Sequence, residues 1–149
     1  MIINEPNKNY NEPMHTCEHI LNQTMVRMFG CGRAISAHIE RKKSKCDYLL
    51  QSIPTELEVV KIEEQVNCII NQHLPVTSEI VDIEEATRIV DVSRLPKSET
   101  DQCRIVKIGS YDVCACIGQH VSNTAQIGRF KIISHEYKEG LWRVRFRLL

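Results

Sequence analysis

Two histidines stand one helical turn apart near the start of the chain. His15 and His19 are separated by four positions in a run whose apolar residues recur at helical spacing. Residues at i and i+4 share one face of a helix, so both imidazoles can reach a single point. This is the spacing with which a helix presents two nitrogen ligands to zinc. Such pairs also occur on ordinary surface helices, so the pair alone predicts only half of a metal site.

A cysteine and a histidine with the same spacing lie in the second half of the chain. Cys116 and His120 fall in residues 114–128, a segment that its glycines and Asn123 mark as a loop between strands. A thiolate and an imidazole would complete a tetrahedral site, and zinc accepts mixed nitrogen and sulfur donors. Cys114 competes with Cys116 as the sulfur ligand, and spacing does not exclude it. The alternative is a solvated His120 beside a buried Cys116 that packs as a small apolar residue.

Two amphipathic helices can position these side chains. The first carries Pro13 in its first turn and stops at the glycines of 30–32. Its apolar stripe is Met14, Cys17, Leu21, Met25 and Met28. The second opens with a capping box of Thr55 and Glu58 and ends before Pro75. Its apolar positions are Val59, Ile62, Val66, Ile69 and Ile70.

Short strands complete the expected fold. We expect strands over 33–40, 45–51, 76–81, 103–109, 130–137 and 141–148, a short helix begun by Asp82, and irregular chain up to residue 102. The first two and the last two strands form hairpins. The fold class is therefore α+β, with two longer helices packed on a mostly antiparallel sheet. Residues 1–12 are a loosely ordered lead-in, and 13–149 form a single domain.

Composition and charge exclude several classes of protein and partner. The 149 residues carry no formal net charge, which argues against binding to nucleic acid by bulk electrostatics alone. No apolar run is long enough to span a membrane, and the N-terminus lacks the features of a secretory signal. Seven cysteines at irregular spacings do not form a disulfide framework. We expect a cytoplasmic protein that contacts neither membrane nor DNA. The sequence does not indicate its oligomeric state.

The two motifs together resemble a known family. An H-x-x-x-H helix followed much later by C-x-x-x-H-V-x-x-T-x-x-I-G is similar to the editing domain of alanyl-tRNA synthetases, and closer still to the free-standing alanyl-tRNA editing proteins of the AlaX type. The family's first motif, usually H-T-A-x-H-(I/L)-L, corresponds to residues 15–21. Its second, usually C-G-G-T-H-V-x-x-T-G-E-I-G, agrees at Cys116, Gly118, His120, Val121, Thr124, Ile127 and Gly128. Residues 63–76 and 84–86 also look similar, and related domains occur in threonyl-tRNA synthetases.

This resemblance implies a site and an activity. It implies that one zinc is held by His15, His19, Cys116 and His120, beside a substrate pocket that includes Gly118, Gln119 and Thr124. The implied reaction is hydrolysis of the ester of a mischarged aminoacyl-tRNA, seryl- or glycyl-tRNA for alanine, and the implied partner is the acceptor end of the tRNA. Zinc would either activate a water or hold the amino group of the substrate. Four protein ligands leave no open position, which favours positioning over water activation.

The chain departs from the family pattern beside the last ligand. Gln119 stands where the family commonly has threonine, and Ile117 where it has glycine. The chain also resembles a minimal version, without the glycine-rich N-terminal subdomain of longer members. Two alternatives to editing therefore stay open. One is a non-catalytic module that binds aminoacyl-tRNA or an amino acid, and the other is a purely structural zinc.

Charged and isolated residues allow further expectations. Glu18 is adjacent to His19 on the helix and therefore points about 100° away from it, so we expect an exposed, salt-bridging residue rather than a general base. The basic residues that could contact tRNA phosphates are Arg41, Lys42, Lys43 and Lys45 at a hairpin turn, and Arg143, Arg145 and Arg147 on one strand face. Such clusters are most often solvated faces. We expect His38 to be exposed or satisfied, and packing roles for Cys31, Cys46, Cys68 and Cys103.

Overall fold

The structure is a computed structural model that describes residues 11–93 and 101–149. Most of the expected lead-in, and part of the irregular stretch before residue 102, lie outside the described residues. The helices are α1 (Glu12–Phe29), α2 (Glu56–Ile70), α3 (Ile83–Ile89) and the short 3-10 helix η1 (Thr124–Gln126). The strands are β1 (Ser36–His38), β2 (Ser44–Leu49), β3 (Val76–Asp82), β4 (Gln102–Ile108), β5 (Asp112–Ala115), β6 (Phe130–Lys138) and β7 (Leu141–Leu148).

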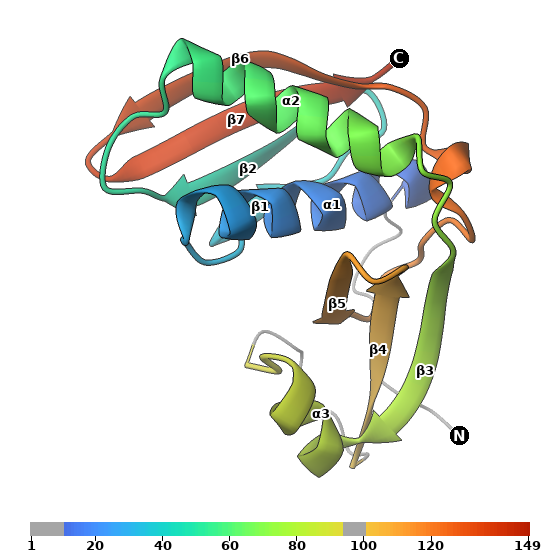
Figure 1. Ribbon diagram of the computed structural model, residues 1–149. Helices are drawn as coiled ribbons and strands as arrows, with labels where there is room; N and C mark the ends of the chain where they lie inside the picture. The colour runs from blue at the N-terminus through green and yellow to red at the C-terminus, as the bar shows by residue number, and fades with distance from the viewer. Residues whose placement is uncertain (1–10, 94–100) are drawn as a thin grey trace.

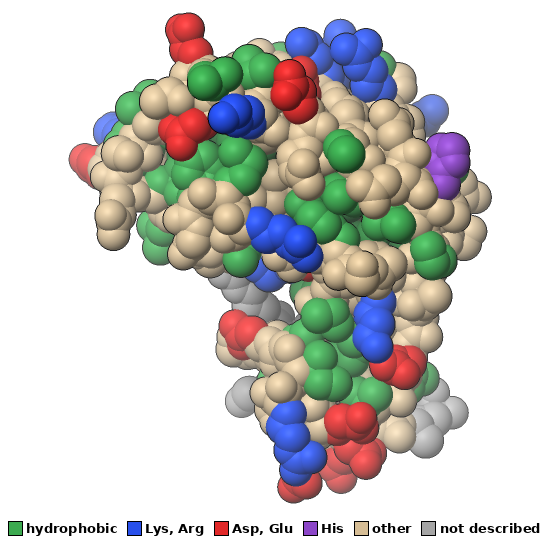
Figure 2. Space-filling view, viewed as in Figure 1, with side chains coloured by type: hydrophobic (Ala, Val, Ile, Leu, Met, Phe, Trp, Pro, Cys, Tyr) green, Lys and Arg blue, Asp and Glu red, His purple; other side chains and the backbone are tan. Residues whose placement is uncertain are grey.

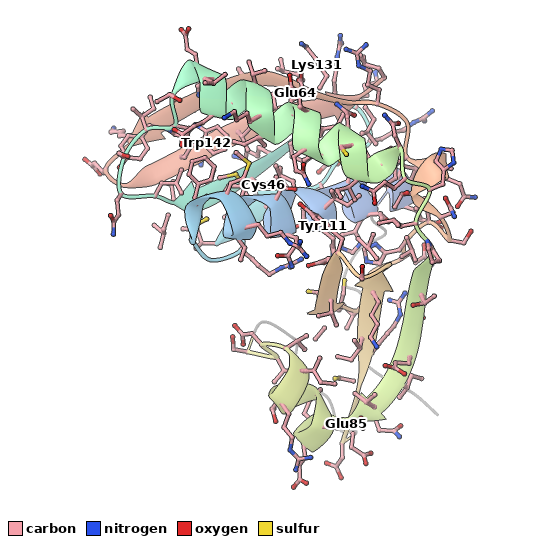
Figure 3. All side chains as sticks on the ribbon, in the orientation of Figure 1. Cys46, Glu64, Glu85, Tyr111, Lys131 and Trp142 are labelled. Atoms are coloured by element: carbon pink, nitrogen blue, oxygen red, sulfur yellow. The ribbon has the colours of Figure 1, made fainter. Side chains whose placement is uncertain are left out.

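Helices α1 and α2 lie side by side on one face of a four-stranded antiparallel sheet, ordered β1-β2-β7-β6 (Figure 1). The main core fills the space between them, and its largest fully buried side chains include Trp142, Tyr48, Phe130 and Phe146. Figure 3 shows Trp142 and Cys46 in this layer. The expected α+β class, with two longer helices on an antiparallel sheet, is confirmed.

Local sequence signals fix the ends of both long helices. The side chain of Asn11 accepts a hydrogen bond from the backbone N–H of Met14, so α1 begins at Glu12, one residue before the expected start. It ends at Gly30, whose φ of 65° is left-handed and favours glycine. The expected capping box of Thr55 and Glu58 is present at the start of α2. Neither helix needs tertiary packing to define where it starts.

A second, smaller sheet was not anticipated. Strands β3, β4 and β5 form a separate antiparallel sheet, which α3 covers with a small core of Ala86, Cys103 and Ile105. In Figure 1 this unit extends away from the helices, and Figure 2 shows it as a narrower body below the larger one. The sequence placed residue 114 at the start of a loop, but Asp112–Ala115 form the edge strand β5. Residues 112–115, Asp-Val-Cys-Ala, do not alternate between polar and apolar side chains, so the pattern does not indicate a strand.

Several single-residue expectations can also be compared with the structure. His38 is exposed, as expected, although β1 covers only three of the eight residues predicted for its strand. Cys46 and Cys103 are buried, and Cys31 packs against the main core. Cys68 is exposed on α2, so its expected packing role is wrong. None of the described helices has the length and apolar character needed to cross a bilayer.

Candidate metal centre and its cleft

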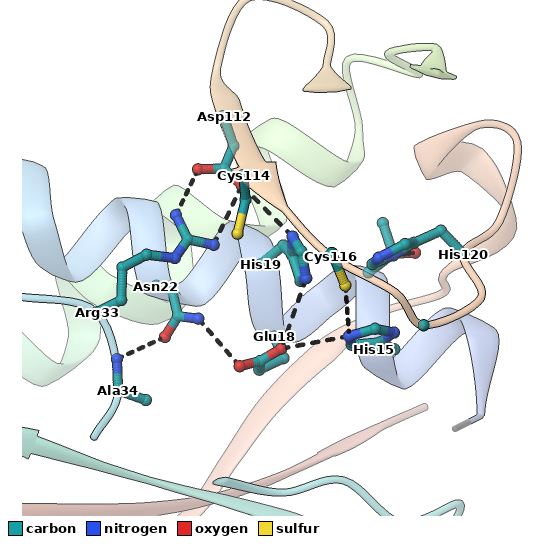
Figure 4. A network of polar contacts seen from close by, with 12 residues as sticks. His15, Glu18, His19, Asn22, Arg33, Ala34, Asp112, Cys114, Cys116 and His120 are labelled. Carbon is teal, nitrogen blue, oxygen red and sulfur yellow. Dashed lines mark hydrogen bonds and ion pairs between the residues drawn. The ribbon is translucent and has the colours of Figure 1, made fainter. Parts of the chain in front are cut away.

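The fold brings the two distant motifs together. His15 and His19 project from α1, and Cys116 and His120 from the segment that follows β5 (Figure 4). One potential ligand atom from each of these residues lies within 4.8 Å of the others. Within the described residues this is the group of His, Cys and carboxylate side chains that could hold a metal ion. Cys114 is not part of it, and its Sγ lies 3.3 Å from the backbone oxygen of Ala115.

Each imidazole in the cluster has a polar neighbour at Nδ1. His15 Nδ1 lies 3.0 Å from the carbonyl oxygen of Gln119, and His120 Nδ1 lies 2.8 Å from Thr16 Oγ1, both within hydrogen-bond distance. His19 Nδ1 lies 3.6 Å from Asp112 Oδ2, an ion-pair contact that is longer than a hydrogen bond. These partners leave the three Nε2 atoms on the inner side of the cluster. Metal-bound histidines are commonly oriented in this way, by a carbonyl, hydroxyl or carboxylate at the other ring nitrogen.

Two further observations suit a metal in this position. His120 Nε2 is buried and has no hydrogen-bond partner, which is costly unless another group occupies the space in front of it. Burial opposes the charged form of Cys116, but hydrogen bonds from the histidines outweigh it and lower the pKa of the thiol far below its usual range. The thiolate is the form in which cysteine binds metals. The residues present therefore fit a nitrogen- and sulfur-coordinated ion.

A buried ion pair supports the cluster from behind. The Asp112 side chain is completely buried and accepts two hydrogen bonds from Arg33, at 2.7 and 3.2 Å, and one from Gln23 at 2.9 Å. Burial raises the pKa of the Asp112 carboxyl, but these donors and His19 outweigh that effect and hold the pKa well below its usual range. The Asp112 carboxylate therefore connects β5 to two other parts of the chain. These are α1, through Gln23 and His19, and the segment after α1, through Arg33. Sequence reasoning missed Asp112 because nothing in the spacing of one aspartate marks it as buried.

The position of Glu18 corrects an expectation. Its side chain is only 14% exposed, and its Oε1 lies 3.8 Å from His15 Nε2 and 3.9 Å from His19 Nε2. The expected exposure is therefore wrong, and the ion-pair neighbours of Glu18 are the two histidines of the cluster. A rotation of 100° from His19 does not lead to solvent here, because Glu18 lies three residues after His15 and faces the chain segment that carries β1.

A cleft of about 560 Å³ opens beside the cluster. Its polar side is formed by α1 and includes His15, Glu18, His19 and Asn22. The aliphatic residues of the lining are Ile35, Ala37, Ile39, Leu49 and Ile117. A ligand in this cleft would therefore meet a carboxylate and the metal cluster as well as aliphatic side chains. Ile117, one of the departures from the family pattern, is thus a cleft residue.

The three residues expected in a substrate pocket occupy different positions. Gly118 lines the cleft, and its carbonyl oxygen accepts a hydrogen bond from Arg104 of β4. Gln119 contributes its backbone carbonyl to His15 while its side chain is exposed. Thr124 is fully buried at η1, where its Oγ1 donates to Ile70 O at 3.0 Å and accepts from Leu74 N at 2.8 Å. A role for each of them in substrate binding stays a prediction.

The basic residues expected to contact tRNA lie on the face of the large sheet opposite the helices and at the β1–β2 turn. Arg41, Lys42 and Lys43 are exposed in the turn. Both Arg143 and Arg145 already have partners, because Arg143 donates to Asp47 at 2.8 and 3.0 Å and Arg145 lies 3.1 Å from Glu136. Lys45 pairs in register with Arg145. Figure 2 shows further basic side chains at the top of the view, and Figure 3, in the same orientation, labels Lys131 there.

Comparison with known proteins relates the chain to tRNA synthetases. Residues 103–145 match the family described as Threonyl and Alanyl tRNA synthetase second additional domain. The chain is 33% identical over 121 residues to an alanine–tRNA ligase of Caldicellulosiruptor saccharolyticus, which covers 80% of this chain. Corresponding proteins of Streptococcus thermophilus and Hyperthermus butylicus are 36% and 34% identical over 82% and 91% of this chain. The chain spans only 14 to 15% of the length of these relatives.

Proposed function

Because the chain is a relative of alanine–tRNA ligases and shares their second additional domain, we propose that it is an editing hydrolase that clears mischarged tRNA. The reaction would be hydrolysis of the ester between an amino acid and the terminal ribose. A pocket shaped for alanine cannot strongly reject the smaller glycine, or serine with its added hydroxyl, so a second site is needed to remove these products. Seryl- and glycyl-tRNA(Ala) are therefore the proposed substrates.

The observation that carries this proposal is the cluster of inward-facing ligand atoms at one side of a cleft. Three Nε2 atoms and the Cys116 sulfur suit zinc, which binds such mixed donor sets in tetrahedral geometry. When bound, zinc would supply positive charge that can orient a substrate group or stabilise developing negative charge. The chain itself holds the ligands through Thr16, Asp112 and the Gln119 carbonyl. Four protein ligands leave no open position for water activation, which favours charge stabilisation and orientation of the ester as the role of the metal.

The shape of the cleft supports a small aminoacyl group as ligand. The ester would meet the polar residues of α1 as well as the aliphatic residues of the lining. Cys116, Ile117 and Gly118 of the second motif line the cleft, so the ester would lie beside that motif. The basic turn at 41–43 supplies exposed cations that could contact the phosphates of an acceptor stem.

The proposal predicts selective release of the wrong amino acid. Zinc-loaded protein should deacylate seryl- or glycyl-tRNA(Ala) at least about 100-fold faster than alanyl-tRNA(Ala), a difference within reach of a site that reads small side-chain differences. Release of each amino acid from tRNA charged in vitro measures this, with uncatalysed hydrolysis as the background. A zinc chelator should suppress the release. Equal rates for all three esters, or rates at background, would contradict the proposal.

A non-catalytic binding module is the second candidate, and Gln119 is the residue that prompts it. Because the Gln119 side chain is exposed and only its carbonyl contacts the cluster, Gln119→Thr should change neither zinc content nor deacylation by more than about twofold, the usual range for a surface substitution. Parallel deacylation assays of the two proteins test this. A large gain of hydrolysis in the variant would instead indicate that glutamine suppresses the reaction and that the natural chain only binds.

A further inference from the structure

We propose that Glu18 binds the α-ammonium group of the substrate, so that the site accepts aminoacyl esters with a free amino group and rejects N-acylated ones. This inference rests on the proposed function and names the chemical group by which that site recognises its substrate class. The family motif leaves this position variable, so the assignment depends on the contacts of this chain.

The Glu18 carboxylate is held in one orientation by a chain of hydrogen bonds (Figure 4). Asn22 Nδ2 donates to Glu18 Oε2 at 3.0 Å. The Asn22 amide cannot rotate freely, because its Oδ1 accepts from Tyr48 Oη at 2.6 Å and from the backbone N–H of Ala34 at 3.2 Å. Tyr48 is fully buried, so this contact is anchored in the main core. Glu18 Oε2 is thereby fixed, and Oε1 faces the metal cluster and the cleft.

Oε1 makes no hydrogen bond within the described residues. It lies 3.8 Å from His15 Nε2 and 3.9 Å from His19 Nε2, beyond hydrogen-bond distance, so its lone pairs can accept a donor from the cleft. Arg33 also lines the cleft, but both of its terminal nitrogens donate to Asp112. A carboxylate that is 14% exposed gains from a cation that enters the cleft.

The proposed substrate brings one such cation. An aminoacyl ester carries its α-ammonium one carbon away from the carbonyl group that is attacked. With four protein donors already assigned to the metal, the carboxylate is the group in the cleft that can take this ammonium as a charge-assisted hydrogen bond. Asp91 is a second carboxylate in the lining, but it is exposed and accepts a hydrogen bond from Ser93 N at 2.8 Å. Glu18 is the one that is held at the cluster.

Binding of non-hydrolysable ligands tests the inference directly. The probes are 3′-amino-3′-deoxyadenosine carrying serine in amide linkage, and the same compound with its α-amino group acetylated. The zinc-loaded natural protein should bind the free-amine probe roughly 10- to 100-fold more tightly, the range expected for a hydrogen bond between charged groups. Glu18→Gln keeps the shape and the Asn22 contact but removes the charge. It should lose this preference while its affinity for the acetylated probe stays unchanged.

Three controls keep the result specific. Glu12→Gln removes a carboxylate from the exposed first turn of the same helix and should leave both affinities as in the natural protein. Zinc content and thermal unfolding of Glu18→Gln should also be unchanged, since a loss of zinc would assign Glu18 to the metal and overturn the inference. The comparison of the two probes on the natural protein needs no variant. Equal binding of both probes, or of neither, would also overturn it.

The outcome is separable from that of the proposed function. Deacylation of tRNA that is unaffected by Glu18→Gln would contradict the role of Glu18 and leave editing in place. A preference for the free-amine probe without any deacylation would support the role of Glu18 in a protein that binds aminoacyl groups and does not cleave them.

Discussion

Replacing Cys116 by alanine should remove zinc from the protein and abolish deacylation at the same time. The thiolate is the one sulfur donor in the cluster, and the remaining three imidazoles would have to bind the ion without its charge. Loss of the hydrogen bonds that orient metal ligands already lowers metal affinity about 10- to 100-fold, so we expect a loss of more than about 100-fold for a direct ligand. Metal content after gel filtration and release of serine from seryl-tRNA(Ala) measure the two effects.

Cys114→Ala is the matched control for this substitution. It removes a sulfur two residues away from Cys116, on a half-buried side chain outside the ligand group. Its zinc content should equal that of the natural protein. Loss of zinc in Cys114→Ala and retention in Cys116→Ala would show that the sulfur ligand is Cys114 and that the assignment to Cys116 is wrong.

The folded state of zinc-free protein separates a working site from a structural one. If zinc takes part in substrate binding or hydrolysis, chelation should stop deacylation while far-UV circular dichroism still shows the helices and sheets. If zinc only fastens α1 to the segment after β5, chelation should unfold the chain as it stops the reaction. The main core packs α1, α2 and the large sheet through buried apolar side chains that do not belong to the ligand group, which favours the first outcome.

Removing the Asp112 carboxylate should have the largest effect on stability. Asp112→Ala leaves Arg33 and Gln23 without their acceptor and takes away the carboxylate beside His19. Breaking a buried ion pair costs about 3–5 kcal/mol, and because the Arg33 side chain is 26% exposed we expect a loss of about 2–4 kcal/mol in the free energy of unfolding. Chemical denaturation of the metal-free proteins measures it.

The exposed pair of Arg145 and Glu136 supplies the control. Its side chains are 30% and 60% exposed, so Glu136→Ala should cost less than about 1 kcal/mol. The double variant Arg33→Met with Asp112→Ala should recover part of the loss, since it leaves no unpaired charge behind. A cost for Asp112→Ala as small as that for Glu136→Ala would contradict the buried-pair interpretation.

The buried pair of Asp112 and Arg33 also makes the free energy of unfolding depend on pH. The pKa of Asp112 is held below its value in the unfolded chain, so its contribution is complete above about pH 4 and is lost as the pH falls through the folded-state pKa. The difference in unfolding free energy between the natural protein and Asp112→Ala should therefore shrink below about pH 4. Repeating the denaturation series at neutral and acid pH checks the sign, and a difference that grows on acidification would refute it.

The ligand cluster could be foreseen because its members obey a local rule. His15 and His19 share a helix face by virtue of their spacing, and the start of α1 is encoded by Asn11 and Pro13. The second pair could be recognised as a partner only through its matching spacing and the family resemblance. Choosing Cys116 over Cys114 required the structure, because the course of the chain after β5 decides which thiol faces the histidines.

The surroundings of the cluster could not be foreseen, because they depend on contacts between distant segments. Asp112 orients a ligand only because β5 passes beside α1, and Glu18 lines a cleft only because the segment with β1 closes over that side of the helix. The split of the strands into two sheets has the same cause. Strands β3 and β4 pair across a long intervening segment. The alternation of polar and apolar residues within each strand does not indicate which other strand it pairs with.

A bound metal would also connect the two layers of the fold. The cluster joins α1 to the segment after β5, and one of its contacts, His15 with Cys116, links residues 101 positions apart. Because the donor atoms come together only in the folded chain, an ion that binds them stabilises that arrangement by about 2.7 kcal/mol when its free concentration is about 100 times its dissociation constant. The ion would thus serve as a reversible cross-link between the small sheet and the helical layer. Availability of the metal would then set how firmly the small sheet is held, while the main core keeps the larger layer folded.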